Sequence, residues 1–163
     1  MALDTDQVAK LRGRVASTDV RLLALLRRTS VPALRISLGV VFIWFGVLKV
    51  LDVSPVSELV ARTVYWFDPN LVVPALGIFE ILVGGLLVLN RWLRLALALF
   101  AAQMVGTFLV FIVLPQVAFR DGYPLLLTVE GEFVLKNLVL LTAGMVVGSQ
   151  LPALASSDRK TSS

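Results

Sequence analysis

Charged and amide side chains lie within or at the ends of the long apolar stretches of this sequence, and these side chains can carry chemistry. Glu80 is the sharpest case, because it stands near the middle of an apolar run that covers residues 71–90. A charged group near the centre of a membrane-spanning helix costs roughly 2.5–3.5 kcal/mol, so it needs a partner or a function. We therefore expect a buried polar cluster, whose candidate members are Lys49, Glu80, Gln103, Glu132, Lys136 and Asn137.

Two interpretations of this cluster are open from the sequence. A structural network of ion pairs would fix the register of the helices, and Lys49 and Lys136 can also extend to the membrane surface. The alternative is a binding site for an anionic or polar head group. Trp44, together with Phe42 and Phe45, either lines a hydrophobic pocket for a quinone or an acyl chain or simply packs against neighbouring helices.

Several kinds of chemistry are excluded by composition. The sequence has no cysteine and no histidine, which removes thiol nucleophiles, histidine-ligated haem and the usual zinc or copper sites. We expect no catalytic residue, no metal, no covalently bound cofactor and no autonomous enzyme activity. The net charge of +4 comes with no motif of a nucleic-acid-binding module, so no nucleic-acid partner is expected.

The elements that must position these residues are membrane-spanning helices. Of the 163 residues, 58% are hydrophobic, and the mean hydropathy of +0.89 exceeds what a soluble domain of this size can bury. A helix rises about 1.5 Å per residue and must cross a core of about 30 Å. The sequence predicts an all-α, four-helix membrane bundle within residues 31–152, with spans near 33–51, 71–90, 92–114 and 133–151.

The basic residues predict the orientation of the bundle. Seven of the 15 lysines and arginines lie in residues 1–35, two are Arg91 and Arg94 in the turn between the second and third spans, and two lie in the C-terminal tail. By the positive-inside rule, both termini are cytoplasmic and the protein is a multi-pass component of the inner, or plasma, membrane.

The flanking segments and the first outer loop are predicted separately. Residues 1–30 form a basic cytoplasmic segment, disordered over 1–15, with a short amphipathic helix from Thr18 to about Arg28 on the inner leaflet or in solvent. Ser54 and Pro55 predict the start of a short surface helix in the outer loop. Residues 153–163 are expected to be a disordered cytoplasmic tail.

Small residues predict where the first two spans approach each other. Gly39 and Gly46 share a face of the first span, and Gly77 and Gly84 share the face of the second span that carries Glu80. Glycines at helical spacing allow close contact between membrane helices, so we expect these four to be packing positions.

Four runs of residues together resemble the DoxX-like superfamily, and within it the YkgB-type inner-membrane proteins associated with reactive-chlorine resistance. The runs are residues 34–39 (LRISLG), 44–49 (WFGVLK), 79–87 (FEILVGGLL) and 131–137 (GEFVLKN). The YkgB-type branch usually has an arginine where this chain has Glu132 and an aspartate where it has Asn137, so the charge balance of the outer cluster differs.

The resemblance implies a four-helix inner-membrane protein in a redox-stress setting. DoxX-like relatives include small subunits associated with a thiosulfate:quinone oxidoreductase and partners in oxidant-defence assemblies. We therefore expect a non-catalytic accessory subunit that binds a lipid, a quinone or a partner protein such as an oxidoreductase, or forms a homo-oligomer. A small carrier or channel for a polar or lipidic solute, and a quinone-interacting oxidoreductase subunit with Glu80 as proton carrier, are the alternatives.

Overall fold

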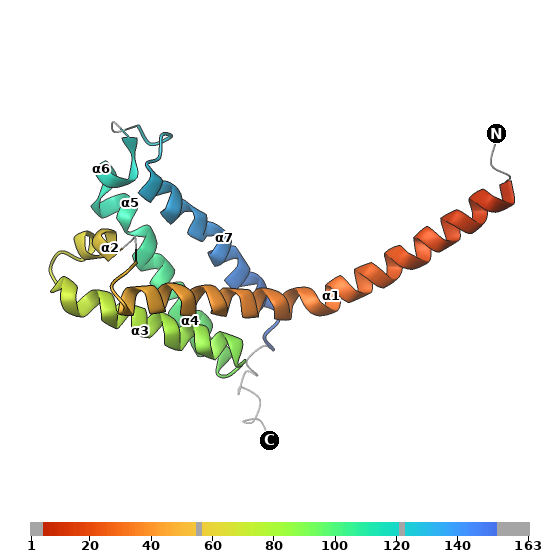
Figure 1. The fold of residues 1–163 in the computed structure, drawn as a ribbon, viewed down its shortest axis with the longest axis horizontal. Helices are drawn as coiled ribbons and strands as arrows, with labels where there is room; N and C mark the ends of the chain where they lie inside the picture. Colours follow the sequence, from red (N-terminus) through yellow and green to blue (C-terminus); the bar gives the residue numbers. More distant parts are fainter. Residues whose placement is uncertain (1–4, 55–56, 121–122, 153–163) are drawn as a thin grey trace, which may run out of the picture.

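The chain forms a bundle of helices with one long helix extending beyond it (Figure 1). A computed structural model describes residues 5–54, 57–120 and 123–152, and describes side chains from residue 19 onward. Within these ranges there is no strand, and the β pairing consists of an isolated antiparallel bridge between Phe119 and Leu127.

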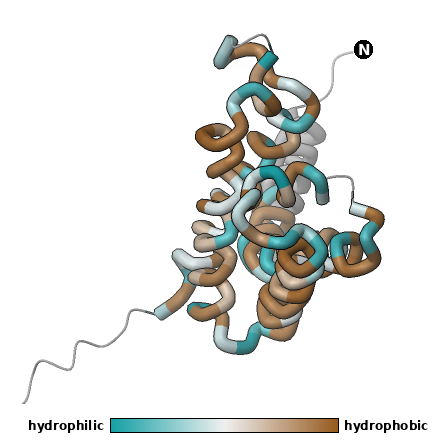
Figure 2. Tube along the Cα trace, turned by 90° about the vertical axis from the view of Figure 1, so that its left-hand side faces the viewer, coloured by the Kyte–Doolittle hydropathy of each residue, from teal (hydrophilic) through white to brown (hydrophobic). Residues whose placement is uncertain are grey.

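Four helical stretches are long and apolar enough to cross a membrane, as the sequence predicts. They are the Asp19–Val50 part of α1 (Thr5–Val50), α3 (Pro69–Val88), α4 (Leu93–Phe108) continued by α5 (Val110–Val113), and α7 (Val129–Ser149). Figure 2 shows hydrophobic residues along most of the bundle. Many large apolar side chains are exposed, which is what a lipid-facing surface requires. The protein is therefore a multi-pass membrane protein.

Helices α1 and α3 pack tightly and antiparallel through two pairs of glycines. A Cβ atom added to Gly39 would lie 2.7 Å from the carbonyl oxygen of Gly84, and one added to Gly77 would lie 2.6 Å from that of Gly46. The two backbones touch at both levels, so any larger residue would push the helices apart. This contact fixes the register in which α1 and α3 face each other.

The end of the bundle at which α3 turns into α4 is closed by a short turn and by a charged cap. Asn90 and Trp92 adopt left-handed backbone conformations, with φ of 55° and 46°, which turn α3 into α4 within a few residues. The Arg35 guanidinium donates hydrogen bonds to the carbonyls of Leu87 and Val88, the latter at 3.1 Å. A cation at the C-terminus of α3 also complements the helix dipole.

The opposite end of the bundle carries two short helices. Helix α2 (Ser57–Thr63) follows α1, and α6 (Pro115–Ala118) precedes the loop that leads to α7 (Figure 1). The sequence predicts that α2 starts at Ser54-Pro55, but the described helix starts at Ser57, and residues 55–56 lie outside the described part. Thr128 caps α7, since its hydroxyl accepts a hydrogen bond from the Gly131 amide at 3.1 Å.

The N-terminal part of the chain differs from the prediction. A separate short helix from Thr18 to about Arg28 was expected before the first span, but α1 is one continuous helix over Thr5–Val50, with Pro32 inside it. The backbone of residues 5–15, expected to be disordered, is also helical. No glycine occurs between residues 14 and 38, and one proline removes only a single backbone hydrogen bond, so the helix continues. The expected disorder of residues 153–163 lies outside the described residues.

Candidate functional site

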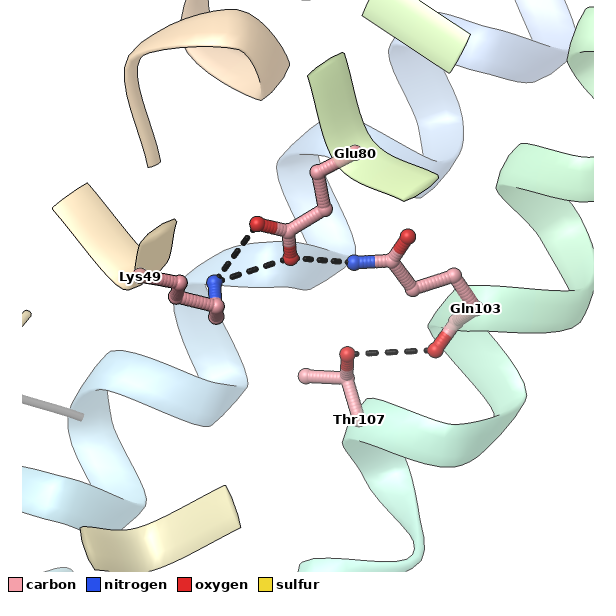
Figure 3. Close-up of polar contacts among 4 residues, drawn as sticks. All are labelled: Lys49, Glu80, Gln103 and Thr107. Carbon is pink, nitrogen blue, oxygen red and sulfur yellow. Dashed lines mark hydrogen bonds and ion pairs between the residues drawn. The ribbon is translucent and has the colours of Figure 1, made fainter. Parts of the chain in front are cut away.

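A buried ion pair joins α1 to α3 in the bundle interior (Figure 3). The Lys49 Nζ lies 2.7 Å from Glu80 Oε2 and 2.9 Å from Oε1, so the ammonium bridges both carboxylate oxygens. Each of the two residues is only 5% exposed. Isolated charges here would be unstable in an apolar environment, so each stabilises the other.

The register of α1 and α3 explains how these two side chains meet. Gly39 faces Gly84 and Gly46 faces Gly77, which places Glu80 about six residues, or about 9 Å, deeper than Lys49. Side chains lean toward the N-terminus of their own helix. Because the helices are antiparallel, the Lys49 side chain leans along α1 toward the level of Glu80, and the Glu80 side chain leans along α3 toward the level of Lys49. The two charged groups therefore converge.

Helix α4 adds an amide to the ion pair. The Gln103 Nε2 donates a hydrogen bond to Glu80 Oε1. The Thr107 hydroxyl donates to the backbone carbonyl of Gln103 at 3.1 Å (Figure 3). The other amide atom, Gln103 Oε1, is buried and has no hydrogen-bond partner in the described part of the chain. A buried acceptor without a partner costs about 1–3 kcal/mol. The polar cluster is therefore incomplete at this atom.

A cavity of about 430 Å³ lies beside the polar cluster. Helices α1, α3, α4 and α7 form most of its walls, and α5 contributes Val110. At the end of the bundle that carries α2, the cavity is lined by Leu59, Val60 and Thr63 of α2 and by Val64, which follows that helix. Most of the lining side chains are apolar, and the polar ones are Lys49, Thr63, Glu80, Gln103, Thr107 and Asn137. The cavity thus has the form of an apolar chamber with one polar wall.

The cavity also reaches the lipid-facing surface of α4. Ala102 and Gly106 line it and are themselves exposed, and they lie four residues apart on one face of the helix. A Cβ atom added to Gly106 would meet no other atom within 4 Å. These two small residues therefore form an exposed rim of the cavity on this face of α4.

The structure brings together only part of the predicted cluster. Asn137 lines the cavity and donates hydrogen bonds from Nδ2 to the Phe133 and Val134 carbonyls, at 3.1 and 3.2 Å. Glu132 and Lys136 instead pair with each other at 3.7 Å on the outer surface of α7, with side chains 59% and 75% exposed. They do not reach the buried ion pair.

Trp44 also lies outside the cavity. It is 65% exposed, whereas Phe42 and Phe45 line the chamber, and the Phe45 ring centroid is 5.9 Å from the Lys49 Nζ. Trp44 lies two positions after Phe42, which turns the tryptophan by about 200° to the opposite face of the helix.

Some lining residues were not singled out from the sequence. Thr107 lies one turn after Gln103, and Phe133 packs its ring against Phe45 with centroids 5.7 Å apart. The four-residue spacing from Gln103 to Thr107 is a usable signal, because such residues share a helix face. Thr63 is buried in α2; its helical spacing in the loop after the first span predicts its place in a short helix but not its place at the cavity.

The arrangement is suited to holding a molecule. The ion pair and the Gln103 amide can orient a polar group, while the aromatic and aliphatic walls can accommodate an apolar chain. Among the described residues there is no group of three or more His, Cys, Asp or Glu side chains that could hold a metal ion.

Comparison with known proteins gives the family of the chain. No curated protein and no solved structure matches it. The DoxX family model matches residues 31–113, which is just over half of the 163 residues and covers Lys49, Glu80 and Gln103. The chain therefore belongs to the DoxX family.

Proposed function

We propose that this DoxX family protein is a non-catalytic accessory subunit that holds an amphipathic molecule, a quinone or a lipid, in the cavity within its helix bundle. The observation that carries the proposal is the apolar chamber with a single polar wall at Lys49, Glu80 and Gln103. Its volume of about 430 Å³ falls in the range of about 300–1,000 Å³ that is usual for small-molecule sites.

The geometry supports a specific pose for such a molecule. A polar head would lie against the ion pair, and the tail would lie along Phe42, Phe133 and Leu140, which line the apolar part. The exposed rim at Ala102 and Gly106 gives a lipid-soluble molecule a route from the membrane without crossing water. A structural ion pair alone needs no chamber beside it.

The redox setting of the proposal rests on the sequence resemblance to the YkgB-type branch. The match to the DoxX family model supports the wider family on which this resemblance depends. A membrane oxidoreductase is the partner that we propose, because the chain itself has no cysteine, histidine or cofactor motif for electron transfer. At matched protein abundance, a strain carrying Glu80→Gln should lose tolerance to hypochlorous acid. Unchanged tolerance would count against the redox role.

We also propose that both termini are cytoplasmic and that the protein resides in the plasma membrane. The projecting part of α1, the α3–α4 turn and the end of α7 lie at one end of the bundle (Figure 1), and Arg91 and Arg94 lie in or next to that turn. Leucines at 22, 23, 25 and 26 are exposed on the helix face opposite Arg27 and Arg28. This amphipathic pattern supports contact with an anionic inner leaflet.

The test is native mass spectrometry of the protein after gentle purification from its own membranes. We expect a stoichiometric quinone or lipid on the wild-type protein. Gly106→Leu should narrow the rim and reduce the retained ligand, because a side chain there is not blocked by other atoms. Gly85→Leu is the matched control, since it also has free space around its Cβ but does not line the cavity. Equal retention by both variants, or none by the wild type, would contradict the proposal.

A further inference from the structure

We propose that the molecule held in the cavity carries an uncharged hydroxyl head group. This inference rests on the proposed function and narrows the ligand to a chemical class, namely a long-chain alcohol, a phenol or a quinol. The evidence is the charge balance of the polar wall and the hydrogen-bonding groups that the wall leaves unused.

The charge balance excludes an ionised head group. Lys49 and Glu80 are the charged side chains among the described residues that line the cavity, and they neutralise each other at 2.7 Å. A carboxylate or phosphate head would lie next to the Glu80 carboxylate with no second cation to compensate it. An ammonium head would likewise lie next to the Lys49 ammonium with no second anion to compensate it. Burial of an uncompensated charge is unfavourable, so a neutral head is preferred.

The unused groups of the polar wall are mainly acceptors. Gln103 donates through Nε2 to Glu80, which leaves its Oε1 buried without a partner. Nε2 rather than Oε1 faces Glu80, because the opposite orientation of the amide would place an oxygen against the carboxylate. Asn137 donates through Nδ2 to its own helix, so its Oδ1 is what it offers to the cavity. The Thr107 hydroxyl likewise donates to a backbone carbonyl.

A hydroxyl group matches this set better than a carbonyl or an ether. A hydroxyl donates one hydrogen bond, which Gln103 or Asn137 can accept, and its oxygen can also accept from Lys49. A quinone carbonyl, an ester or an ether can only accept, and it would leave both amide oxygens without a donor. Gln103 Oε1 is buried rather than open to the chamber, so its terminal amide must shift slightly to meet the ligand, and that torsion is soft.

The experiment uses the delipidated full-length protein in mild detergent with three ligands of matched length. These are 1-hexadecanol, its methyl ether and hexadecanoate, offered together at equal concentration and counted as bound adducts by native mass spectrometry. We expect the alcohol to exceed each of the others by about tenfold, the ratio given by one buried hydrogen bond. A separate arm compares a decyl-substituted quinol with its quinone and distinguishes a lipid alcohol from a quinol as the source of the hydroxyl.

The variant Gln103→Met should remove the preference for the alcohol, while Gln150→Met, an exposed glutamine outside the cavity, should retain it. Equal binding of the three ligands, or preference for the carboxylate, would overturn the hydroxyl inference and leave the proposed function standing. Binding of none of the ligands, including the quinol and quinone, would overturn both. If Gln103→Met does not fold, the ratios on the wild-type protein still decide.

Discussion

Removal of one partner of the buried ion pair is the perturbation whose effect the structure specifies best. In Lys49→Met, the Glu80 carboxylate stays 5% exposed and keeps only the hydrogen bond from Gln103. Loss of one member of a buried pair costs about 3–5 kcal/mol, because the other charge is left uncompensated. We expect the free energy of unfolding to fall by that amount, and by a similar amount in Glu80→Met.

The double variant Lys49→Met/Glu80→Met should be much less destabilised than the sum of the two single variants. Replacement of a whole buried pair by apolar residues is often neutral or stabilising, and methionine approximates the volume of both side chains. The coupling energy of the double-mutant cycle should therefore be several kcal/mol, larger than the roughly 0.5–3 kcal/mol that is usual for residues in contact.

The assay is unfolding of the purified protein in mixed micelles by increasing amounts of a denaturing detergent, followed by circular dichroism. The pair Glu132 and Lys136 is the matched control, since it joins the same residue types at 3.7 Å but is 59% and 75% exposed. Its coupling should be about 0.2–1 kcal/mol. Additive effects of Lys49→Met and Glu80→Met would refute the reasoning.

Three further predictions concern the elements that hold the bundle. Gly46→Ala should destabilise the protein by about 1–3 kcal/mol, whereas Gly85→Ala, which has free space around the new Cβ, should be neutral or slightly stabilising in the same unfolding assay. Arg35→Met should cost about 1–3 kcal/mol, because the C-terminal carbonyls of α3 lose a charged donor. Arg27→Gln with Arg28→Gln should weaken binding of the N-terminal segment to anionic vesicles, measured by co-sedimentation, and should not affect neutral vesicles.

Hydropathy and length were sufficient to predict the four spans, because the requirement for about 20 apolar residues leaves little choice. The exact bounds of the third and fourth spans could not be predicted in this way. The third is described as α4 and α5, and α7 begins at Val129, four residues before the predicted start. The Thr128 cap, which also contacts the segment around Ala118, determines that start, and this tertiary contact is not visible in the pattern.

The candidate site was partly predictable because a charge in the middle of a span demands a partner. This requirement identifies Glu80 as the buried charge and Lys49 as a candidate partner, because Lys49 is the nearest cation on the glycine-bearing face of α1. The sequence does not discriminate between Lys136 and Asn137, which are neighbours and were both expected in the cluster. Adjacent residues on a helix differ by about 100°, so both cannot face the same cavity, and only the packing of α7 decides that Asn137 faces inward.

The chamber itself could not be predicted from the sequence. Its lining residues come from six helices, and one side of it depends on where α2 lies over the bundle. The unpartnered Gln103 Oε1 also requires coordinates, because it follows from the direction in which the amide donates to Glu80.

The most direct test of the central claim is photo-cross-linking with an amphiphile whose tail carries a diazirine, followed by peptide mapping in lipid nanodiscs. We expect labelling of Phe42, Phe133 and Leu140, which line the chamber, and we expect an excess of unlabelled ligand to suppress this labelling. Trp44 and Val139 are exposed on the outer surface of the bundle, so any labelling of these two residues should persist in the presence of excess unlabelled ligand, as for ordinary lipid contacts. Labelling confined to these outer residues would contradict the account.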